Sequence, residues 1–183
     1  MYYLLSMHEK AVIKGDALYF VTLKVAGYID VFTCQEYCNI VIDKLNYCIE
    51  RNHLHVYEYV LMPSQLYLIT SSKTKHISKA LRDLKGYTGK DILKSIAENP
   101  EENRKEWLMR LFHTIDNRYQ NNAENHFWQF GNQPVSLDNS ALLQQKASFV
   151  INIPVTAKMV DKPQHYIYSS AFPRQNVKLT EWH

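Results

Sequence analysis

The chain has 183 residues, of which 46% are hydrophobic and 13% aromatic, with a formal charge of +3 and a pI of about 8.6. This composition excludes an intrinsically disordered chain, and its mildly basic balance permits nucleic-acid binding without requiring it. There is no run of roughly 18 apolar residues that could cross a membrane, and residues 1–8 lack the regions of a signal peptide. The length predicts a single domain over residues 1–183.

The cysteine content indicates a reducing compartment. The chain has three cysteines, Cys34, Cys38 and Cys48. An odd number without short paired spacing is typical of free thiols, so we expect a cytoplasmic protein. Cys34 and Cys38 lie one helical turn apart, but no second ligand pair completes a zinc site.

The first half of the chain alternates strand and helix patterns. Residues 17–25 are rich in β-branched and aromatic side chains and predict a strand. Thr33 and Glu36 have the spacing of a capping box, and residues 37–48 then place apolar side chains on one helical face. Residues 54–62 and 65–70 predict two further strands joined by a tight Pro63-Ser64 turn, which makes them antiparallel.

The second half is mostly helical. We expect a helix over about residues 75–96, and another that begins after Asn99 with Pro100 at its first position. Residues 126–130 and 134–137 are short strand-like segments. Asp138 can cap a last helix over about residues 139–152, which Pro154 ends, and the tail from about residue 155 is irregular. The order predicts an α+β fold of the ferredoxin-like kind, an antiparallel sheet with helices packed on one face.

Four segments, taken in order, resemble REP-associated tyrosine transposases, relatives of the small single-tyrosine insertion-sequence transposases of the HUH type. They are residues 19–22 with Phe32-Thr33, residues 60–69, residues 127–129, and residues 149–155 with 163–171. The family has Met-(Pro/Ser)-Asn-His-Val-His-Leu-Ile in the second segment and Tyr-Ile-His-x-Asn-Pro-Val in the fourth. Each motif alone is weak, but together at family spacing they span nearly the whole chain.

The resemblance implies a chemistry for DNA transposition and recombination. In the family, two histidines on one strand hold magnesium or manganese, and the metal acts as a Lewis acid on the scissile phosphate. A tyrosine on the last helix attacks single-stranded DNA and forms a covalent phosphotyrosine link. An amide side chain one helical turn later completes the metal site.

The corresponding positions of this chain differ from the family pattern at every site. The two histidine positions are Gln65 and Tyr67, the nucleophile position is Phe149, and the helper amide position is Ile153. Neither a catalytic group nor a metal site is intact, so we expect no cofactor and predict that catalysis is lost. We also expect Phe149 to lie near the face of a central strand that carries Gln65 and Tyr67.

An alternative is an active metal-dependent nickase that uses other ligands. His53 and His55 form a literal His-hydrophobe-His pattern at the start of the second predicted strand. Their position lies at the far end of the hairpin from the turn, so a pair of exposed strand-end histidines is the favoured interpretation.

The second predicted helix carries a basic stripe opposite its apolar face. The stripe consists of Lys75, Lys79, Arg82 and Lys90. A solvated surface is the default interpretation of such a stripe, and a surface that follows DNA phosphates is the alternative that the resemblance favours. Tyr87 lies nearby and is compatible with base stacking or with the core.

The main hypothesis is therefore a transposase-like protein, derived from a mobile-element enzyme, that binds single-stranded or hairpin DNA without catalysis. A scaffold protein that binds no nucleic acid remains a further alternative. The resemblance is compatible with a homodimer or a monomer, because related small transposases are often dimers whereas REP-associated ones can be monomers.

Overall fold

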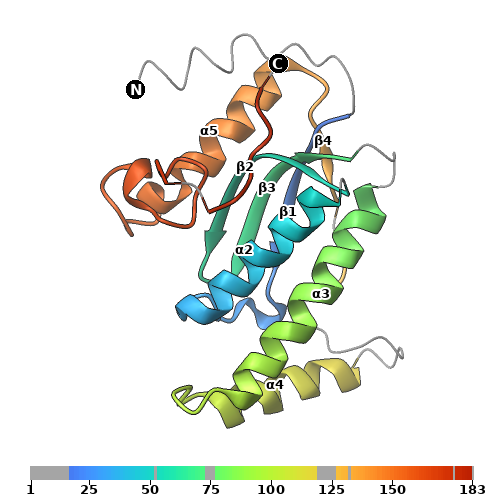
Figure 1. Ribbon diagram of the computed structural model, residues 1–183, viewed down its shortest axis with the longest axis vertical. Helices are drawn as coiled ribbons and strands as arrows, with labels where there is room; N and C mark the ends of the chain where they lie inside the picture. The colour runs from blue at the N-terminus through green and yellow to red at the C-terminus, as the bar shows by residue number, and fades with distance from the viewer. Residues whose placement is uncertain are drawn as a thin grey trace.

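The computed structural model describes residues 17–51, 53–72, 77–118, 127–131, 133–174 and 176–182. Its centre is a four-stranded sheet of order β2-β3-β1-β4, in which every neighbouring pair is antiparallel (Figure 1). The strands are β1 (Tyr19–Lys24), β2 (His55–Met62), β3 (Gln65–Ser71) and β4 (Val135–Ser136). The helices are α2 (Gln35–Glu50), α3 (Ile77–Glu98), α4 (Lys105–Arg118) and α5 (Ser140–Thr156), with short 3-10 turns at Ala26–Tyr28 and Pro163–His165. The predicted α+β class, with a four-stranded antiparallel sheet, is confirmed.

Helices cover both faces of the sheet. Side chains alternate between the faces of a strand, and β1 contributes apolar side chains to both of them. Val21 and Leu23 join the core that contains residues of α2 and α3, whereas Phe20 joins a second apolar cluster with Leu143 and Val150 of α5. The predicted packing of helices on one face of the sheet therefore holds for α2 and α3. Helix α5 covers the opposite face, because the apolar side chains on that face also have to be removed from water.

The start of α2 differs from the predicted capping box. The Thr33 hydroxyl donates to the Asp30 carbonyl, and Cys34 precedes the helix without a side-chain cap. The Glu36 carboxylate instead accepts hydrogen bonds from Ser95 and Asn99 across the α2–α3 interface. A tertiary contact has thus replaced the local one.

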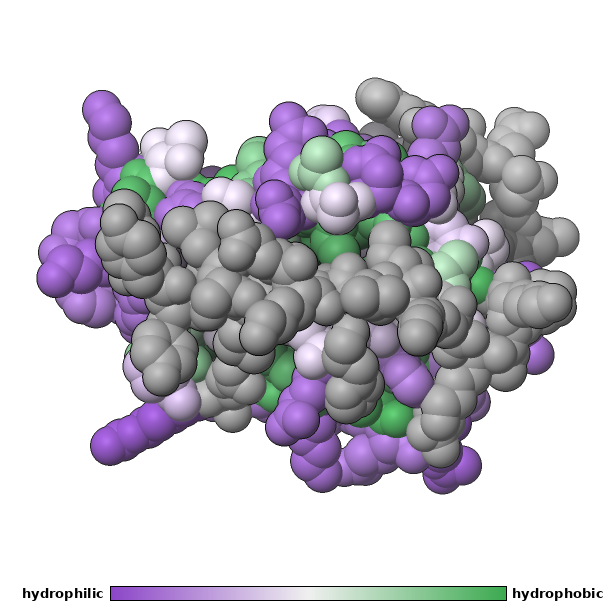
Figure 2. All heavy atoms as spheres, turned by 90° about the horizontal axis from the view of Figure 1, so that it is seen from above, coloured by the Kyte–Doolittle hydropathy of each residue, from purple (hydrophilic) through white to green (hydrophobic). Residues whose placement is uncertain are grey.

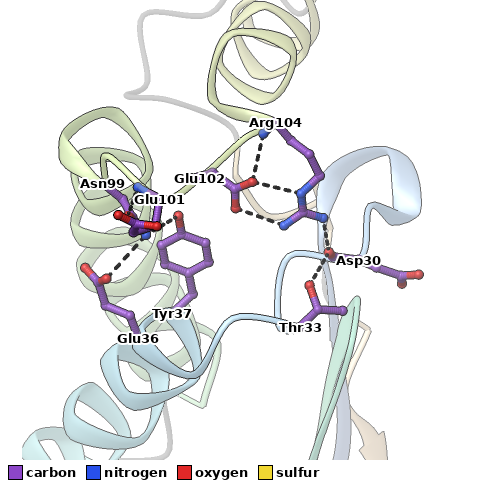
Figure 3. A network of polar contacts seen from close by, with 8 residues as sticks. All are labelled: Asp30, Thr33, Glu36, Tyr37, Asn99, Glu101, Glu102 and Arg104. Atoms are coloured by element: carbon purple, nitrogen blue, oxygen red, sulfur yellow. Dashed lines mark hydrogen bonds and ion pairs between the residues drawn. The ribbon is translucent and has the colours of Figure 1, made fainter.

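The predicted start of the next helix at Pro100 is also wrong, since α4 begins at Lys105. Asn99 accepts the Glu101 N–H at 2.8 Å and donates to the Tyr37 hydroxyl at 3.3 Å. Arg104 pairs with Glu102 at 2.9 Å and also donates to the Asp30 carbonyl at 2.9 Å. Figure 3 shows that these bonds link the α3–α4 connection to the start of α2, which holds the intervening residues in a turn.

The last helix is longer than predicted and has a different cap. Asn139, not Asp138, accepts the Leu142 N–H at 2.7 Å. Pro154 lies inside α5, which continues to Thr156. A proline removes one N–H donor, and hydrogen bonds continue beyond it, as from the Ala157 N–H to the Ile153 carbonyl at 2.9 Å.

The segment after α5 is largely irregular and is anchored along the outer edge of β2. Ser169 forms an isolated antiparallel bridge with Val60, and the Leu61 N–H donates to the Tyr168 carbonyl at 2.9 Å. The Thr180 N–H donates to the Val56 carbonyl at 2.7 Å. The segment therefore shields an edge that would otherwise be open to pairing with another chain.

Among the described residues, no helix is long and apolar enough to cross a membrane. On the face seen in Figure 2, hydrophilic side chains form most of the coloured outline, and apolar surface is broken into small areas between them.

Candidate functional site

Gln65 and Tyr67 lie at the start of β3, directly after the hairpin turn, on the face that α5 covers. The Tyr67 hydroxyl donates to Gln65 Oε1 at 2.8 Å. Burial raises the pKa of Tyr67 above its ordinary value of 10.0, so the phenol is neutral at pH 7 and acts as a donor. The prediction that both side chains share one face of a central strand is confirmed.

Phe149 of α5 lies against this pair. Its ring meets the Tyr67 ring edge-on with centroids 5.7 Å apart, and the Phe20 ring edge-on at 6.0 Å. Phe20 and Tyr67 are stacked at 6.2 Å. The expected proximity of Phe149 to the strand face is therefore confirmed, and the three rings form what we term the aromatic cluster (Phe20, Tyr67 and Phe149).

A lysine that the sequence interpretation missed completes this surface. Lys146 Nζ lies 4.8 Å from the ring centroid of Phe20 and 5.9 Å from that of Phe149, within the range of cation–π attraction. Phe149 itself is 44% exposed. Lys146 could have been noticed from its spacing, because a residue three positions before Phe149 shares its helical face.

Ile153 lies one turn after Phe149 and is half-buried against the apolar cluster beneath α5. The adjacent Asn152 turns away from the strand, because its amide donates to the Ser148 carbonyl of the same helix at 2.8 Å. Asn152 therefore does not replace the amide that the family pattern has at position 153.

These side chains do not fit a divalent metal. A divalent metal needs several nitrogen or oxygen donor atoms that converge on one point. Gln65 Oε1 is the single amide oxygen at these four positions and accepts the Tyr67 hydroxyl, the phenol is neutral, and Phe149 and Ile153 have no atom that can bind a metal. The cluster is instead held together by ring contacts and one hydrogen bond.

The alternative histidine pair is remote from this cluster. His55 pairs with Ser71 at one end of the β2–β3 hairpin, whereas Gln65 pairs with Met62 beside the turn. At about 3.3 Å per residue, the six steps from Gln65 to Ser71 along β3 span roughly 20 Å. Within the described ranges, no group of three or more histidine, cysteine, aspartate or glutamate residues could hold a metal ion.

The basic stripe lies on the outer side of α3. Lys79, Arg82 and Lys90 are exposed, while Ile77, Ala80, Leu81 and Leu84 of the same helix are buried. Lys75 lies outside the described residues. The described part of the stripe thus has the predicted orientation.

Tyr87 belongs to the surface rather than to the core. It is 41% exposed and meets Tyr47 of α2 edge-on at 5.9 Å.

The other segments behind the family resemblance have packing roles. The Trp128 Nε1–H donates to the Thr88 hydroxyl at 2.8 Å, and Phe127 is fully buried. A methyl group added at Gly89 would come within 3.1 Å of the Phe127 Cβ, so α3 approaches this segment closely. The Ser170 hydroxyl bonds to the buried Glu58 carboxylate.

The sequence matches no protein-family model and no curated protein. Its structure is similar to that of a REP-associated tyrosine transposase bound to a REP hairpin, with a TM-score of 0.58 and 12% identity over 86% of this chain and 78% of that chain. A putative transposase from Deinococcus radiodurans aligns with a TM-score of 0.45 and 14% identity over 76% of this chain and 94% of that chain. The first of these likenesses shows that the chain has the fold of a REP-associated tyrosine transposase.

Proposed function

We propose that this protein is a catalytically inactive relative of the REP-associated tyrosine transposases that binds single-stranded or hairpin DNA. The observation that carries the proposal is the contact between Phe149 and Tyr67. It brings together the positions at which the family pattern has a nucleophile and a metal ligand, and neither side chain can serve that role.

The loss of chemistry follows from two independent deficiencies. Phe149 has no hydroxyl to attack a phosphate, so no phosphotyrosine forms at this position. Gln65, Tyr67 and Ile153 do not fit the metal that would polarise the phosphate. Nucleophile and metal act as one unit in such reactions, so either deficiency alone is severe.

DNA binding is supported by charge placed on a rigid element. Lys79, Arg82 and Lys90 lie on the outer side of one long helix, where their ammonium and guanidinium groups can follow a phosphate backbone. The similar transposase is bound to a REP hairpin, which makes hairpin DNA the first ligand to test.

A binding titration at several salt concentrations tests the DNA part of the proposal. We expect a hairpin to bind at low salt, with affinity falling steeply as salt is added because each neutralised phosphate releases counterions. Lys79→Glu with Arg82→Glu should reduce affinity by about tenfold or more and flatten the salt dependence. The matched control, Lys158→Glu with Lys162→Glu, makes the same charge change at exposed residues after α5. Absence of binding by the unmodified protein at low salt would favour a scaffold that binds no nucleic acid.

An adduct assay tests the chemical part. The unmodified protein, incubated with hairpin or single-stranded DNA and magnesium or manganese, should neither nick the DNA nor become covalently linked to it. A covalent adduct mapped to any tyrosine would overturn this part. Metal-dependent nicking that His53→Ala and His55→Ala abolish would instead establish the alternative nickase.

A further inference from the structure

One position in the middle of the basic stripe of α3 has no side chain. The stripe and this glycine recur at three- or four-residue spacing along one side of the helix, as Lys79, Arg82, Gly86 and Lys90. The three charged residues are exposed, and so is Gly86. The stripe therefore has a gap between its positive side chains.

Nothing in the described part of the chain requires a glycine at this position. A Cβ added at Gly86 would meet no atom within 4 Å, whereas one added at Gly89 would come within 3.1 Å of the Phe127 Cβ. The backbone of Gly86 is helical and has no positive φ. A glycine inside a helix is destabilising relative to alanine, because it loses more conformational freedom on folding. Gly86 thus weakens α3 without a packing reason among the described residues, which points to the close approach of another molecule.

The side of the gap that faces α2 carries two tyrosines and an arginine. Helices α2 and α3 lie side by side on the same face of the sheet (Figure 1). Tyr87, next to Gly86, meets Tyr47 of α2 edge-on at 5.9 Å, and Arg51 Cζ lies 5.0 Å from the ring centroid of Tyr47. Both tyrosines are exposed, and phenol hydroxyls are among the groups that donate to phosphate oxygens. The gap therefore has groups that can bind phosphate on α2 as well as on α3.

Two carboxylates of α3 lie near the stripe, and each has a cationic neighbour. Asp83 Oδ1 lies 4.0 Å from Arg82 Nε, and Asp91 Oδ2 lies 2.6 Å from Lys44 Nζ. These neighbours offset part of the negative charge. The two lysines of the stripe then leave the outer side of this part of α3 positive, which suits a polyanion.

The spacing along α3 suits one sugar-phosphate backbone that crosses the helix. Arg82 and Lys90 each lie four residues from Gly86, which is about 6 Å along the axis at 1.5 Å per residue. A backbone that crosses at Gly86 can approach the main chain closely and has a cation at each side. A duplex presents its phosphates outward and hides the faces of its bases, whereas single strands are bound through open rings on which bases stack. The rings of Tyr47 and Tyr87 pack on each other, so the surface suits a duplex better.

We propose that Gly86 is the point at which one backbone of a duplex DNA stem crosses α3. The inference rests on the proposed function and adds to it which part of the DNA is bound and where the backbone lies. Phosphate contacts carry no base sequence, so this contact should not depend on the sequence of the stem.

Gly86→Gln tests the inference, because glutamine leaves the net charge unchanged, favours the helix and fills the gap. We expect the variant to unfold at a higher temperature than the unmodified protein and yet to bind a hairpin about tenfold more weakly, since the cations are held away from the phosphates. Fluorescence anisotropy measures the affinity. Effects of opposite sign on stability and binding exclude loss of the fold as the cause. Ala141→Gln is the matched control at an exposed small residue of α5, and it should change the affinity by less than about twofold.

Two further DNA molecules distinguish the part of the ligand that is bound. A blunt duplex with the sequence of the stem should lose about tenfold in affinity with Gly86→Gln, and an unpaired single strand of equal length less than about twofold. An equal or larger loss with the single strand, or an unchanged affinity for a hairpin that does bind, would overturn the inference alone. A hairpin that fails to bind the unmodified protein would overturn it together with the proposed function.

Discussion

Two regions of this molecule differ in how closely their residues match the family pattern. The segment at Phe127 and Trp128 and the segment at Ser169 and Ser170 keep the family residues, and all four side chains are buried. The surface around Phe149 differs from the family pattern in its residues, and Phe149 is 44% exposed. The residues that match the family pattern in these two segments are thus ones that pack the core, whereas the positions that differ from it lie at a partly exposed surface.

The largest expected effect is on the free energy of unfolding, and it distinguishes the buried segment from the surface around Phe149. Phe127→Ala should lower the free energy of unfolding by about 3–5 kcal/mol, because it opens a cavity among Phe32, Phe112 and Trp128. Phe149→Ala, the same substitution at the exposed ring, should cost less than about 1 kcal/mol. Urea denaturation measures both. Equal losses would show that the aromatic cluster is as important to the fold as the buried segment.

A smaller loss of stability is expected when the hydrogen bond of Trp128 in the buried segment is removed. Thr88→Val removes the acceptor of the Trp128 indole N–H, which is buried, and should cost about 1–3 kcal/mol in the free energy of unfolding. Thr114→Val is the control, since that hydroxyl makes a comparable bond to its own helix at an exposed position. A cost for Thr88→Val no greater than that of the control would mean that the indole finds another acceptor.

The sequence predicted more of the sheet than of the helix ends. Strands β2 and β3 and their turn were predictable because alternation and the Pro63-Ser64 pair are local signals. The start of α2 was not, because Glu36 bonds to Ser95, 59 positions away in the chain. Local capping signals cannot anticipate such a partner.

The difference between local signals and distant contacts also decides what could be predicted of the candidate site. The grouping of Gln65, Tyr67 and Phe149 followed from family spacing and strand alternation, and the structure places the three side chains together. A cavity of about 310 Å³ beside Phe20 and Val135 did not follow, because it depends on where the connection after Gln129 leaves β1. No residue pattern reports the path of such a connection.

Tyr67→Phe probes the aromatic cluster itself. Loss of the hydroxyl breaks its 2.8 Å bond to Gln65 in a half-buried setting and should cost about 0.5–1.5 kcal/mol in the free energy of unfolding. Tyr57→Phe is the matched control, a half-buried tyrosine packed against the same apolar cluster. A loss no larger than the control's would indicate that the cluster depends on ring contacts alone.

The smallest expected change in the free energy of unfolding is that of Phe149→Tyr. The ring is 44% exposed, so a hydroxyl at its tip can reach water, and we expect the free energy of unfolding to change by no more than about 0.5 kcal/mol. The variant places a tyrosine where the family pattern has its nucleophile but adds no metal ligand, because Gln65, Tyr67 and Ile153 remain. We therefore expect no covalent adduct with DNA in the presence of magnesium or manganese, since an unactivated phenol is a weak nucleophile.

The converse variant should also form no covalent adduct with DNA. Gln65→His with Tyr67→His rebuilds two ligands on one strand face but leaves a phenylalanine at the attacking position. Only the combination of all these changes with Ile153→Asn assembles nucleophile and metal site together, and adduct formation by that combined variant alone would show that the two deficiencies act as one unit. An adduct from Phe149→Tyr by itself would mean that the protein supplies an activating group outside these four positions, and the face around Lys146 would then be the first place to look for it.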